Sequence, residues 1–349
     1  MPVFTLNPLS DPRWDDFVEQ HPRGSIFHTS GWLQALHRTY QYQPKWVTAY
    51  DPSAPLSEGI LFCEVNSWLT GRRLVSLPFS DHCDPLVTSP AEASGLVEHL
   101  QTMMTSGKYR YVEFRPSAPA SCLTGNRAAT CCDRFHLHTL SLDLPLGELF
   151  QRMHKDCIQR KVRRAERESL SYVKGRSGQL LDHFYELLLL TRRRHQLPPQ
   201  PLQWFRNLSD CLGDRMAVHV AYKSDQAVAA ILTLTFKDTV TYKYGCSDER
   251  FANLGGTPLL FWKIIEEAKN AGSRRLDLGR SDLDNPGLAT FKERLGGERQ
   301  ELNYYRLSAK PIAAGHRPSW VMPLARRAFS CIPDSLLVAS GKLLYRHIG

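Results

Sequence analysis

A nine-residue pattern that occurs twice constrains the fold of this chain more than any other feature. The segment from Gly107 reads GKYRYVEFR and the segment from Gly272 reads GSRRLDLGR, so both fit G-x-x-R-x-x-x-x-R. Each follows a run of apolar residues at helical spacing, over 91–106 and 257–271. A glycine directly after a helix supplies a left-handed cap, and the alternating residues that follow it predict a strand.

The elements before this pattern recur in the same order. Predicted hairpins over 59–78 and 227–244 precede the two helices, and predicted strands at 45–50 and 217–222 precede the hairpins. The two series lie 165 residues apart, from Gly107 to Gly272, which is about the size of one domain. Antiparallel hairpins combined with a crossover helix predict an α/β (α+β) mixed sheet in each half.

The duplication sets the predicted domain limits. We expect an N-terminal domain at 1–145, a C-terminal domain at 146–310 that carries the active site, and an amphipathic helical tail at 311–349. Apolar residues between Leu146 and Val162 recur at helical spacing, which predicts one long helix with its basic residues on the other face.

Charge and cysteine content limit the class of protein. Lys and Arg number 44 against 35 Asp and Glu, so the formal net charge is +9, which favours nucleic acid, nucleotide phosphates or anionic lipid as partners. The basic residues gather at 152–167, at 192–194 and in the tail, although each cluster also fits an ordinary solvated helix face. The nine cysteines form no CxxC pair, which predicts reduced thiols and no metal site. The first residues show no secretory signal and no apolar run is long enough to span a bilayer, so we expect a cytoplasmic protein.

One loop between a predicted strand and a predicted helix carries a phosphate-binding pattern. Residues 247–257 read SDERFANLGGT, and backbone N–H groups at a helix N-terminus bind phosphate where glycines allow a close approach. Arg250, Asn253 and Gly255, followed by Gly256, resemble the Q/R-x-x-G-x-G/A acyl-CoA loop of GNAT acetyltransferases, with Asn in place of the first glycine. An ordinary glycine-containing helix cap is the alternative. Serine-hydrolase, Walker, zinc-peptidase and dinucleotide motifs do not occur in the sequence.

Over about residues 10–310 the chain resembles the FemAB/GNAT-like acyltransferase family. The similarity is carried by FHTSGW at 27–32, TRRRHQLPPQP at 191–201, YKYG at 242–245, LGRSD at 278–282 and LATFK at 288–292. The end of the tail, LLYRHIG at 343–349, is similar to FemAB-like proteins of exopolysaccharide systems. The resemblance implies two tandem GNAT folds and transfer of an acyl group from acyl-CoA, an acyl carrier or aminoacyl-tRNA to an amine. It implies no tightly bound cofactor.

The resemblance also assigns candidate residues. By position in the family motif, Phe291 and Lys292 lie at the donor site, where Lys292 neutralises a phosphate or the developing oxyanion. We expect Lys292 to be exposed, so that Lys292→Ala lowers transfer without unfolding the protein. Tyr244 corresponds to a strand tyrosine that helps hold the acceptor.

Amide formation further needs a base for the incoming ammonium. Asp282, just past a strand end, is the preferred base, with Asp81 and Asp248 as alternatives that also fit turn-capping carboxylates. The candidate substrate contacts are Arg194, His195, Arg280, Asp81 and Trp32.

Two features depart from the peptidoglycan branch of the family. Trp32 is followed by Leu33 and Gln34 where that branch has a basic residue, and its coiled-coil arm is missing. The resemblance as a whole implies a FemAB-like N-acyltransferase that transfers an acyl or aminoacyl group to an amine of a cell-envelope or exopolysaccharide intermediate. The alternative is a non-catalytic protein that uses its basic surface to bind nucleic acid or a membrane.

The tail contains two apolar faces with basic residues at their edges, over 321–329 and 336–344. This combination predicts peripheral contact with the anionic inner face of the cytoplasmic membrane. Docking of the same faces on the second domain is the alternative.

Overall fold

The computed structural model of the 349-residue chain describes residues 2–119, 121–126, 128–309 and 333–348. The described residues form two compact units. The first contains 2–135, 301–309 and 342–348, and the second contains 136–300 and 333–341. The domain limits at 145/146 and 310/311 stay a prediction.

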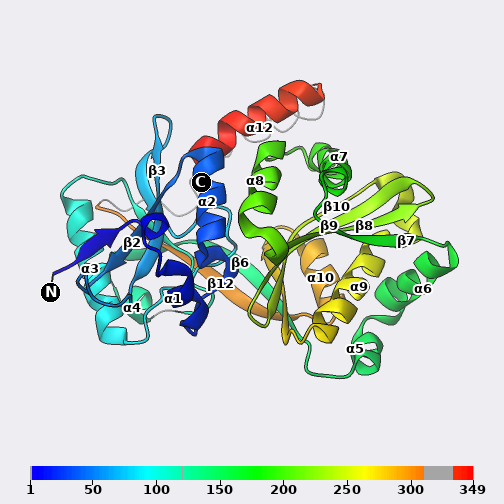
Figure 1. Cartoon of the computed structure of the whole chain (residues 1–349), viewed down its shortest axis with the longest axis horizontal. Helices are drawn as coiled ribbons and strands as arrows, with labels where there is room; N and C mark the ends of the chain where they lie inside the picture. The colour runs from blue at the N-terminus through cyan, green and yellow to red at the C-terminus, as the bar shows by residue number, and fades with distance from the viewer. Residues whose placement is uncertain (1, 120, 127, 310–332, 349) are drawn as a thin grey trace. The chain divides into compact units, whose positions relative to one another are not determined.

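The second unit is a mixed sheet with helices on both faces (Figure 1). Its strand order is β6 (Ala129–Ser141, of which 136–141 belong to this unit), β11 (Arg275–Asp282), β10 (Thr239–Ser247), β9 (Gln226–Phe236), β8 (Met216–Lys223) and β7 (Ser171–Gly175). Helices α7 (Gly178–Arg194) and α8 (Leu202–Leu212) cover one face. Helices α9 (Gly256–Asn270) and α10 (Pro286–Arg294) cover the other, with α5 (Leu146–Arg152) and α6 (Arg160–Arg167) next to α9.

An apolar stripe explains why α9 lies on this sheet. Phe261, Ile264 and Ile265 recur at helical spacing and are at most 2% exposed. They share a core with Ala229 and Ile231 of β9, whose side chains are equally buried. Each large side chain removed from water in this way contributes about 1.5–3 kcal/mol to folding.

The first unit repeats this architecture. Its strand order is β1 (Phe4–Leu6), β2 (Gln43–Thr48), β3 (Ile60–Ser67), β4 (Gly71–Val75), β5 (Val112–Phe114) and β12 (Glu298–Leu307). Its helices are α1 (Trp14–Gln20), α2 (Ser30–Tyr40), α3 (Pro90–Thr105) and the short α4 (Ser121–Thr124). Leu96, Val97 and Leu100 of α3 share a core with Phe62 and Phe114 of the sheet.

The predicted duplication of elements is confirmed. The order β2–β3–β4–α3–β5 in the first unit matches β8–β9–β10–α9–β11 in the second. In both units the crossover helix joins two parallel neighbours, with Leu74 opposite Val112 in one and Thr239 opposite Arg275 in the other. The fold is therefore a tandem α/β arrangement with a mixed sheet, as the repeat predicted.

The long helix predicted from Leu146 is wrong in one respect, because it is broken near His154. Helix α5 ends at Arg152, and a π-helical turn over Lys155–Gln159 leads into α6. The His154 ring accepts hydrogen bonds from the backbone N–H groups of Asp156 and Cys157, both at 3.3 Å. A side-chain cap of this kind starts a new helical segment without any proline or glycine.

The second predicted tail helix is confirmed as α12 (Asp334–Ile348). The first, at 321–329, lies outside the described residues. Within α12, Leu337 is buried, whereas Leu336 and Leu343 are 57% and 61% exposed. None of the described helices is both long enough and apolar enough to cross a membrane.

Candidate active site

The two central strands of the second unit stop pairing partway along their length. The parallel ladder of β10 and β11 begins at Thr239 opposite Arg275 and, in the described residues, ends at Thr241 opposite Asp277. Strand β10 then contains a bulge between Tyr242 and Tyr244, where its register against β9 shifts. We call the remainder of the two strands, 242–247 and 278–282, the strand fork. Open α/β sheets bind ligands at the carboxyl ends of parallel strands, so the strand fork is a candidate ligand-binding position.

A buried lysine holds one arm of the strand fork. Gly279 has a φ of +70°, and its N–H donates to Asp277 Oδ1 at 2.8 Å. Successive carbonyls of a regular strand point to opposite edges. Here the carbonyls of Gly279 and Arg280 both accept from Lys292 Nζ, at 2.9 and 2.8 Å, because the strand is kinked between them.

This arrangement corrects the expectation that Lys292 is exposed. Its residue exposure is 1%, and its ammonium group hydrogen-bonds backbone oxygens. Lys292 therefore fixes the backbone of the fork, and replacing it will affect folding as well as transfer.

The predicted phosphate loop lies between β10 and α9. Asp248 is 5% exposed, and its carboxylate accepts from the backbone N–H and the guanidinium of Arg250, with Oδ2 to Nη2 at 2.6 Å. The hydrogen bond from Arg250 holds the pKa of Asp248 below its usual value. A carboxylate stabilised in its charged form is a weak base, so Asp248 fits the turn-capping alternative.

The N-terminus of α9 is built without a side-chain cap. Its N-cap residue, Gly255, has a φ of +83°, and a Cβ there would overlap the carbonyl of Lys161. Uncapped N–H groups and the helix dipole favour an anion at this position. Asn253, whose side chain is exposed, and Gly256 lie on either side of Gly255.

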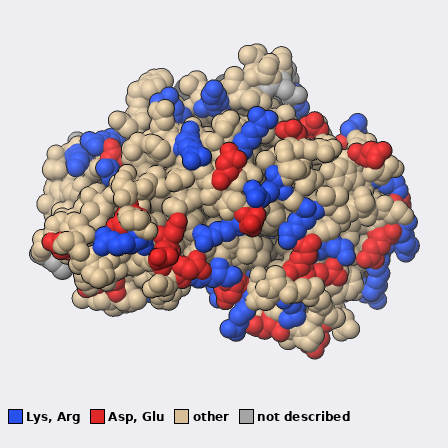
Figure 2. All heavy atoms as spheres, viewed as in Figure 1, with Lys and Arg blue, Asp and Glu red and all other residues tan. Residues whose placement is uncertain are grey.

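Basic side chains of α6 lie close to this helix N-terminus. Helix α6 contacts both α9 and the loop over Glu249–Leu254. Four of its basic residues are exposed, namely Arg160, Lys161, Arg163 and Arg167. Figure 2 shows blue spheres gathered at the edge of the molecule where Figure 1 places α6. The uncapped helix and the basic α6 together suit the phosphates of a nucleotide-linked acyl donor.

Gly255→Ala should destabilise the protein by about 1–3 kcal/mol more than Gly272→Ala, as measured by urea unfolding, because its methyl group would overlap the Lys161 backbone. Both glycines have nearly the same φ, +83° and +82°, so the conformational strain of alanine is matched. Only at Gly255 would the new methyl group meet the backbone, because nothing lies within 4 Å of a Cβ at Gly272. Equal losses for the two variants would contradict the close packing of the loop on Lys161.

Tyr244 and Phe291 make their contacts on opposite faces of the second unit's sheet. Tyr244 is 7% exposed, and its hydroxyl accepts a hydrogen bond from Trp204 Nε1 of α8 at 3.0 Å. The half-buried Phe291 of α10 instead packs on Phe261 of α9, with ring centroids 5.6 Å apart. The two residues therefore cannot contact one ligand group together without a conformational change.

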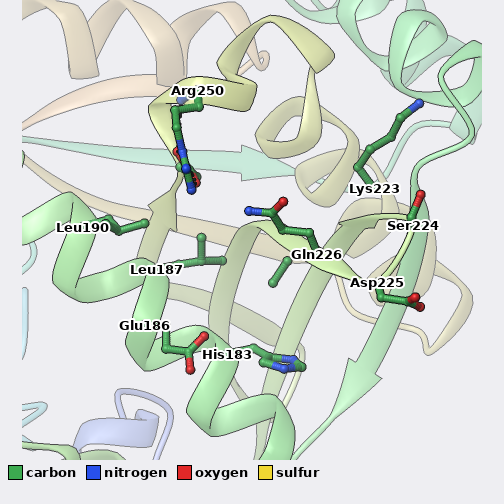
Figure 3. A pocket seen from close by; sticks show the side chains of 11 residues that line it. His183, Glu186, Leu187, Leu190, Lys223, Ser224, Asp225, Gln226 and Arg250 are labelled. Carbon is green, nitrogen blue, oxygen red and sulfur yellow. Dashed lines mark hydrogen bonds and ion pairs between the residues drawn. The ribbon is translucent and has the colours of Figure 1, made fainter.

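A pocket of about 730 Å³ opens beside the loop (Figure 3). Helix α7 contributes His183, Glu186, Leu187 and Leu190 to its lining, the turn of the β8–β9 hairpin contributes 223–227, and the loop contributes Asp248 and Arg250. Figure 3 shows Gln226 directed toward Arg250. Sequence reasoning missed the α7 and hairpin residues, because the only signal was the helical spacing of 183, 186, 187 and 190 on one face.

The remaining second-unit candidates lie at element ends. Asp282 is exposed at the end of β11, and Arg280 is half-buried before it. Arg194 and His195 are exposed where α7 ends. The described residues contain no group of three or more His, Cys, Asp or Glu side chains that could hold a metal ion.

In the first unit, Arg115 stands at the repeat position that corresponds to Arg280 of the strand fork. Arg115, the repeat counterpart of Arg280, donates to the Leu77 carbonyl at 3.0 Å and to Glu113 at 2.8 Å. Asp81 offers its backbone carbonyl to the Tyr304 hydroxyl. Trp32 is fully buried and packs on Phe27, with ring centroids 5.0 Å apart. Its burial makes it a core residue in this structure and does not favour the predicted substrate contact.

Comparisons with known proteins agree with this geometry. Residues 152–293 match the family model described as an acetyltransferase (GNAT) domain. The chain is similar in structure to FemX, with a TM-score of 0.67, 13% identity, and coverage of 87% of this chain and 97% of FemX. It also resembles the C-terminal domain of a putative lysylphosphatidylglycerol synthetase from Agrobacterium fabrum, with a TM-score of 0.57, 15% identity, and coverage of 96% and 98%. No curated protein matches the sequence.

A third similar structure is itself a tandem repeat. It is a tandem GNAT protein from the clavulanic acid biosynthesis pathway, with a TM-score of 0.52, 11% identity, and coverage of 89% of this chain and 99% of that protein. The matched GNAT domain contains the strand fork, the loop and the N-terminus of α9. Residues 152–293 therefore form a GNAT domain, and the chain has the fold of FemX over most of its length.

Proposed function

We propose that the second unit binds an acyl-CoA with its thioester in the strand fork and transfers the acyl group to the amine of a cell-envelope intermediate. The proposal rests on the shape of this part of the second unit. The parallel ladder between β10 and β11 is only three residue pairs long, and β10 then contains a bulge. After β10, helix α9 begins at Gly255 without a side-chain cap and lies beside the basic helix α6. The fork exposes strand backbone to a pantetheine amide, and the helix N-terminus meets the phosphates. Aminoacyl-tRNA is the other donor that presents phosphates to this surface.

The reaction needs a neutral amine, a bond to the thioester carbonyl and loss of the thiolate. The amine gives one proton to a base, its lone pair forms the C–N bond, and the C–S bond breaks as the thiolate leaves and takes up a proton. We assign the base to Asp282, which is exposed at the fork and is not paired with an arginine as Asp248 is. Lys292 acts as a positioning residue, because its ammonium holds the two carbonyls that precede Ser281 and Asp282.

The pocket beside the loop suits the acceptor better than the donor. Its lining has three carboxylates, Glu186, Asp225 and Asp248, against two cations, Lys223 and Arg250. A net negative lining attracts an ammonium group and repels a polyphosphate. The neighbours named as FemX and lysylphosphatidylglycerol synthetase support an acceptor of the cell envelope. Such an acceptor, whether peptidoglycan or exopolysaccharide intermediate, fits a cytoplasmic enzyme in peripheral contact with the membrane.

Thermal stabilisation tests the donor. We expect acyl-CoA thioesters to raise the melting temperature of the purified protein, since a ligand at 100 times its Kd adds about 2.7 kcal/mol. Lys161→Glu on α6 should weaken this stabilisation, whereas Arg206→Glu on α8, at the opposite face of the sheet, should not. Stabilisation by RNA alone, in a strongly salt-dependent manner, would instead support the non-catalytic binding protein.

Asp282→Asn should lower kcat by about 10²–10⁴ and leave the unfolding free energy almost unchanged, because the side chain is exposed. Asp284→Asn, two residues away and equally exposed, is the matched control and should keep full activity. The measurement is release of free thiol from the acyl-CoA that the thermal screen identifies, in the presence of an amine. Equal kcat values for the two variants would show that Asp282 is not the base.

A further inference from the structure

The tip of the β3–β4 hairpin exposes large apolar side chains. Trp68 is 83% exposed and Leu69 is 56% exposed. The tip is nevertheless rigid, because the buried Ser67 hydroxyl accepts hydrogen bonds from the N–H groups of Leu69 and Thr70, at 3.1 and 3.0 Å. A rigid turn that presents tryptophan and leucine to water indicates a surface that contacts something apolar.

The last turn of α12 packs beside this tip and extends the apolar surface. His347 hydrogen-bonds the Ser67 hydroxyl through Nδ1 at 2.9 Å, and its ring lies 5.6 Å from that of Trp68. The backbone carbonyl of His347 accepts from Arg73 Nη2 at 2.7 Å. One turn earlier, Leu343 is 61% exposed. The helix thus buries one apolar side, at Leu337, and exposes another.

The Lys and Arg side chains on the helix and beside the hairpin tip are not balanced by any acidic residue of these two segments. Neither the tip at 68–71 nor the helix at 335–347 contains Asp or Glu. Arg110 is exposed and donates to the Thr70 carbonyl at 3.2 Å, and Lys342 and Arg346 are exposed on either side of Leu343. A protruding tryptophan and leucine with lysine and arginine beside them complement the interface of an anionic bilayer, where aromatic rings and basic groups both gather.

We propose that this surface, formed by 68–70 with Arg110 and the exposed residues of 342–346, docks the protein on an anionic lipid bilayer. We call it the docking surface. Trp68 and Leu69 enter the boundary between headgroups and acyl chains, and Arg110, Lys342 and Arg346 meet the anionic headgroups. The proposal gives the predicted membrane contact of the tail a defined set of residues and adds the hairpin, which the sequence did not indicate. It does not depend on the transfer reaction.

Sedimentation with lipid vesicles tests the docking surface. The full-length protein should sediment with vesicles of phosphatidylcholine and phosphatidylglycerol and much less with phosphatidylcholine alone. The double variant Trp68→Ser/Leu69→Ser should weaken this binding on the order of tenfold or more, because it removes the inserted apolar area. Val173→Ser, which changes an apolar side chain 42% exposed on β7, is the matched control and should bind as the wild type does.

The charge contribution has its own readout. Arg110→Gln/Lys342→Gln should reduce binding to the anionic vesicles and make it less sensitive to salt. Equal binding to both vesicle types, or no loss in the Trp68→Ser/Leu69→Ser variant, overturns the proposal. A dimer in sedimentation equilibrium that this variant abolishes, without vesicle binding, would show self-association instead. Melting temperatures with acyl-CoA, which this variant should leave unchanged, separate failure of the docking surface from failure of the proposed donor site.

Discussion

Lys292→Met is expected to lower the free energy of unfolding by about 2–4 kcal/mol, because it removes the two hydrogen bonds from a buried ammonium group to the backbone carbonyls of the fork. The side chain is 1% exposed and its ammonium serves the carbonyls of Gly279 and Arg280. Methionine keeps the length and the apolar stem of the side chain, so the loss reports the hydrogen bonds rather than a cavity. Denaturant unfolding of the wild type and the variant measures the difference, and kcat should fall with it because Asp282 lies two residues after the second of these carbonyls, that of Arg280.

Lys263→Met provides the control for this variant. Lys263 Nζ pairs with Glu266 at 2.8 Å on the outside of α9, and its side chain is 35% exposed. Surface pairs of this kind contribute about 0–1 kcal/mol. Similar losses for the two lysines would mean that the carbonyls of the fork find other donors, and Lys292 would then lose its role as a positioning residue.

Glu113→Gln is expected to destabilise the first unit by about 3–5 kcal/mol at neutral pH, because it removes the buried negative charge that pairs with two guanidinium groups, one of which, Arg306, has Asp133 as a more distant partner at 3.9 Å. Glu113 of β5 is 3% exposed and binds Arg115 at 2.8 Å and Arg306 of β12 at 2.7 Å. Burial alone raises the pKa of Glu113, but the two arginines outweigh it and hold the pKa below its usual value. Glutamine has the same shape, so the variant isolates the charge.

The pH dependence follows from the direction of that shift. A carboxyl with a lowered pKa in the folded state stabilises the fold above its unfolded pKa of about 4.3, and this stability is lost as the pH falls through the folded value. The wild type should therefore lose its advantage over Glu113→Gln below about pH 4. Glu64→Gln is the control, because the partners of Glu64, Arg72 and Lys45, are more solvated, with side chains 43% and 30% exposed. A pH-independent difference between wild type and Glu113→Gln would contradict the assignment.

The sequence predicted those parts of the fold that local patterns determine. The glycine after each crossover helix, at 107 and 272, and the alternating strands around it located the repeated elements correctly. The break at His154 could not be predicted, because a histidine side chain replaces the usual signals of proline or glycine. Local pattern therefore indicated which elements form, and side-chain hydrogen bonds decided where one of them stops.

The candidate site was predictable only in part for a similar reason. The loop from Arg250 to Gly256 follows from its glycines and its position between strand and helix. The burial of Lys292 depends on the kink at Gly279, thirteen residues earlier, which brings two carbonyls to one ammonium. The pocket combines α7 with a hairpin turn some forty residues later, and no motif joins such distant segments. Contacts made by tertiary folding thus supplied what sequence spacing could not.

The position of β12 has a consequence for how the chain is made. Apart from the first residues of β12, at 298–300, the strands of the second unit lie before residue 283, whereas the first unit needs the rest of β12 (Glu298–Leu307) beside β5 to complete its sheet. During synthesis the edge of β5 in the amino-terminal unit therefore stays unpaired until the ribosome has made nearly the whole chain. Domains usually fold from the N-terminus as they emerge, and open strand edges invite wrong pairing. In this protein the edge of β5 that pairs with β12 therefore stays open until residues 298–307 have been made.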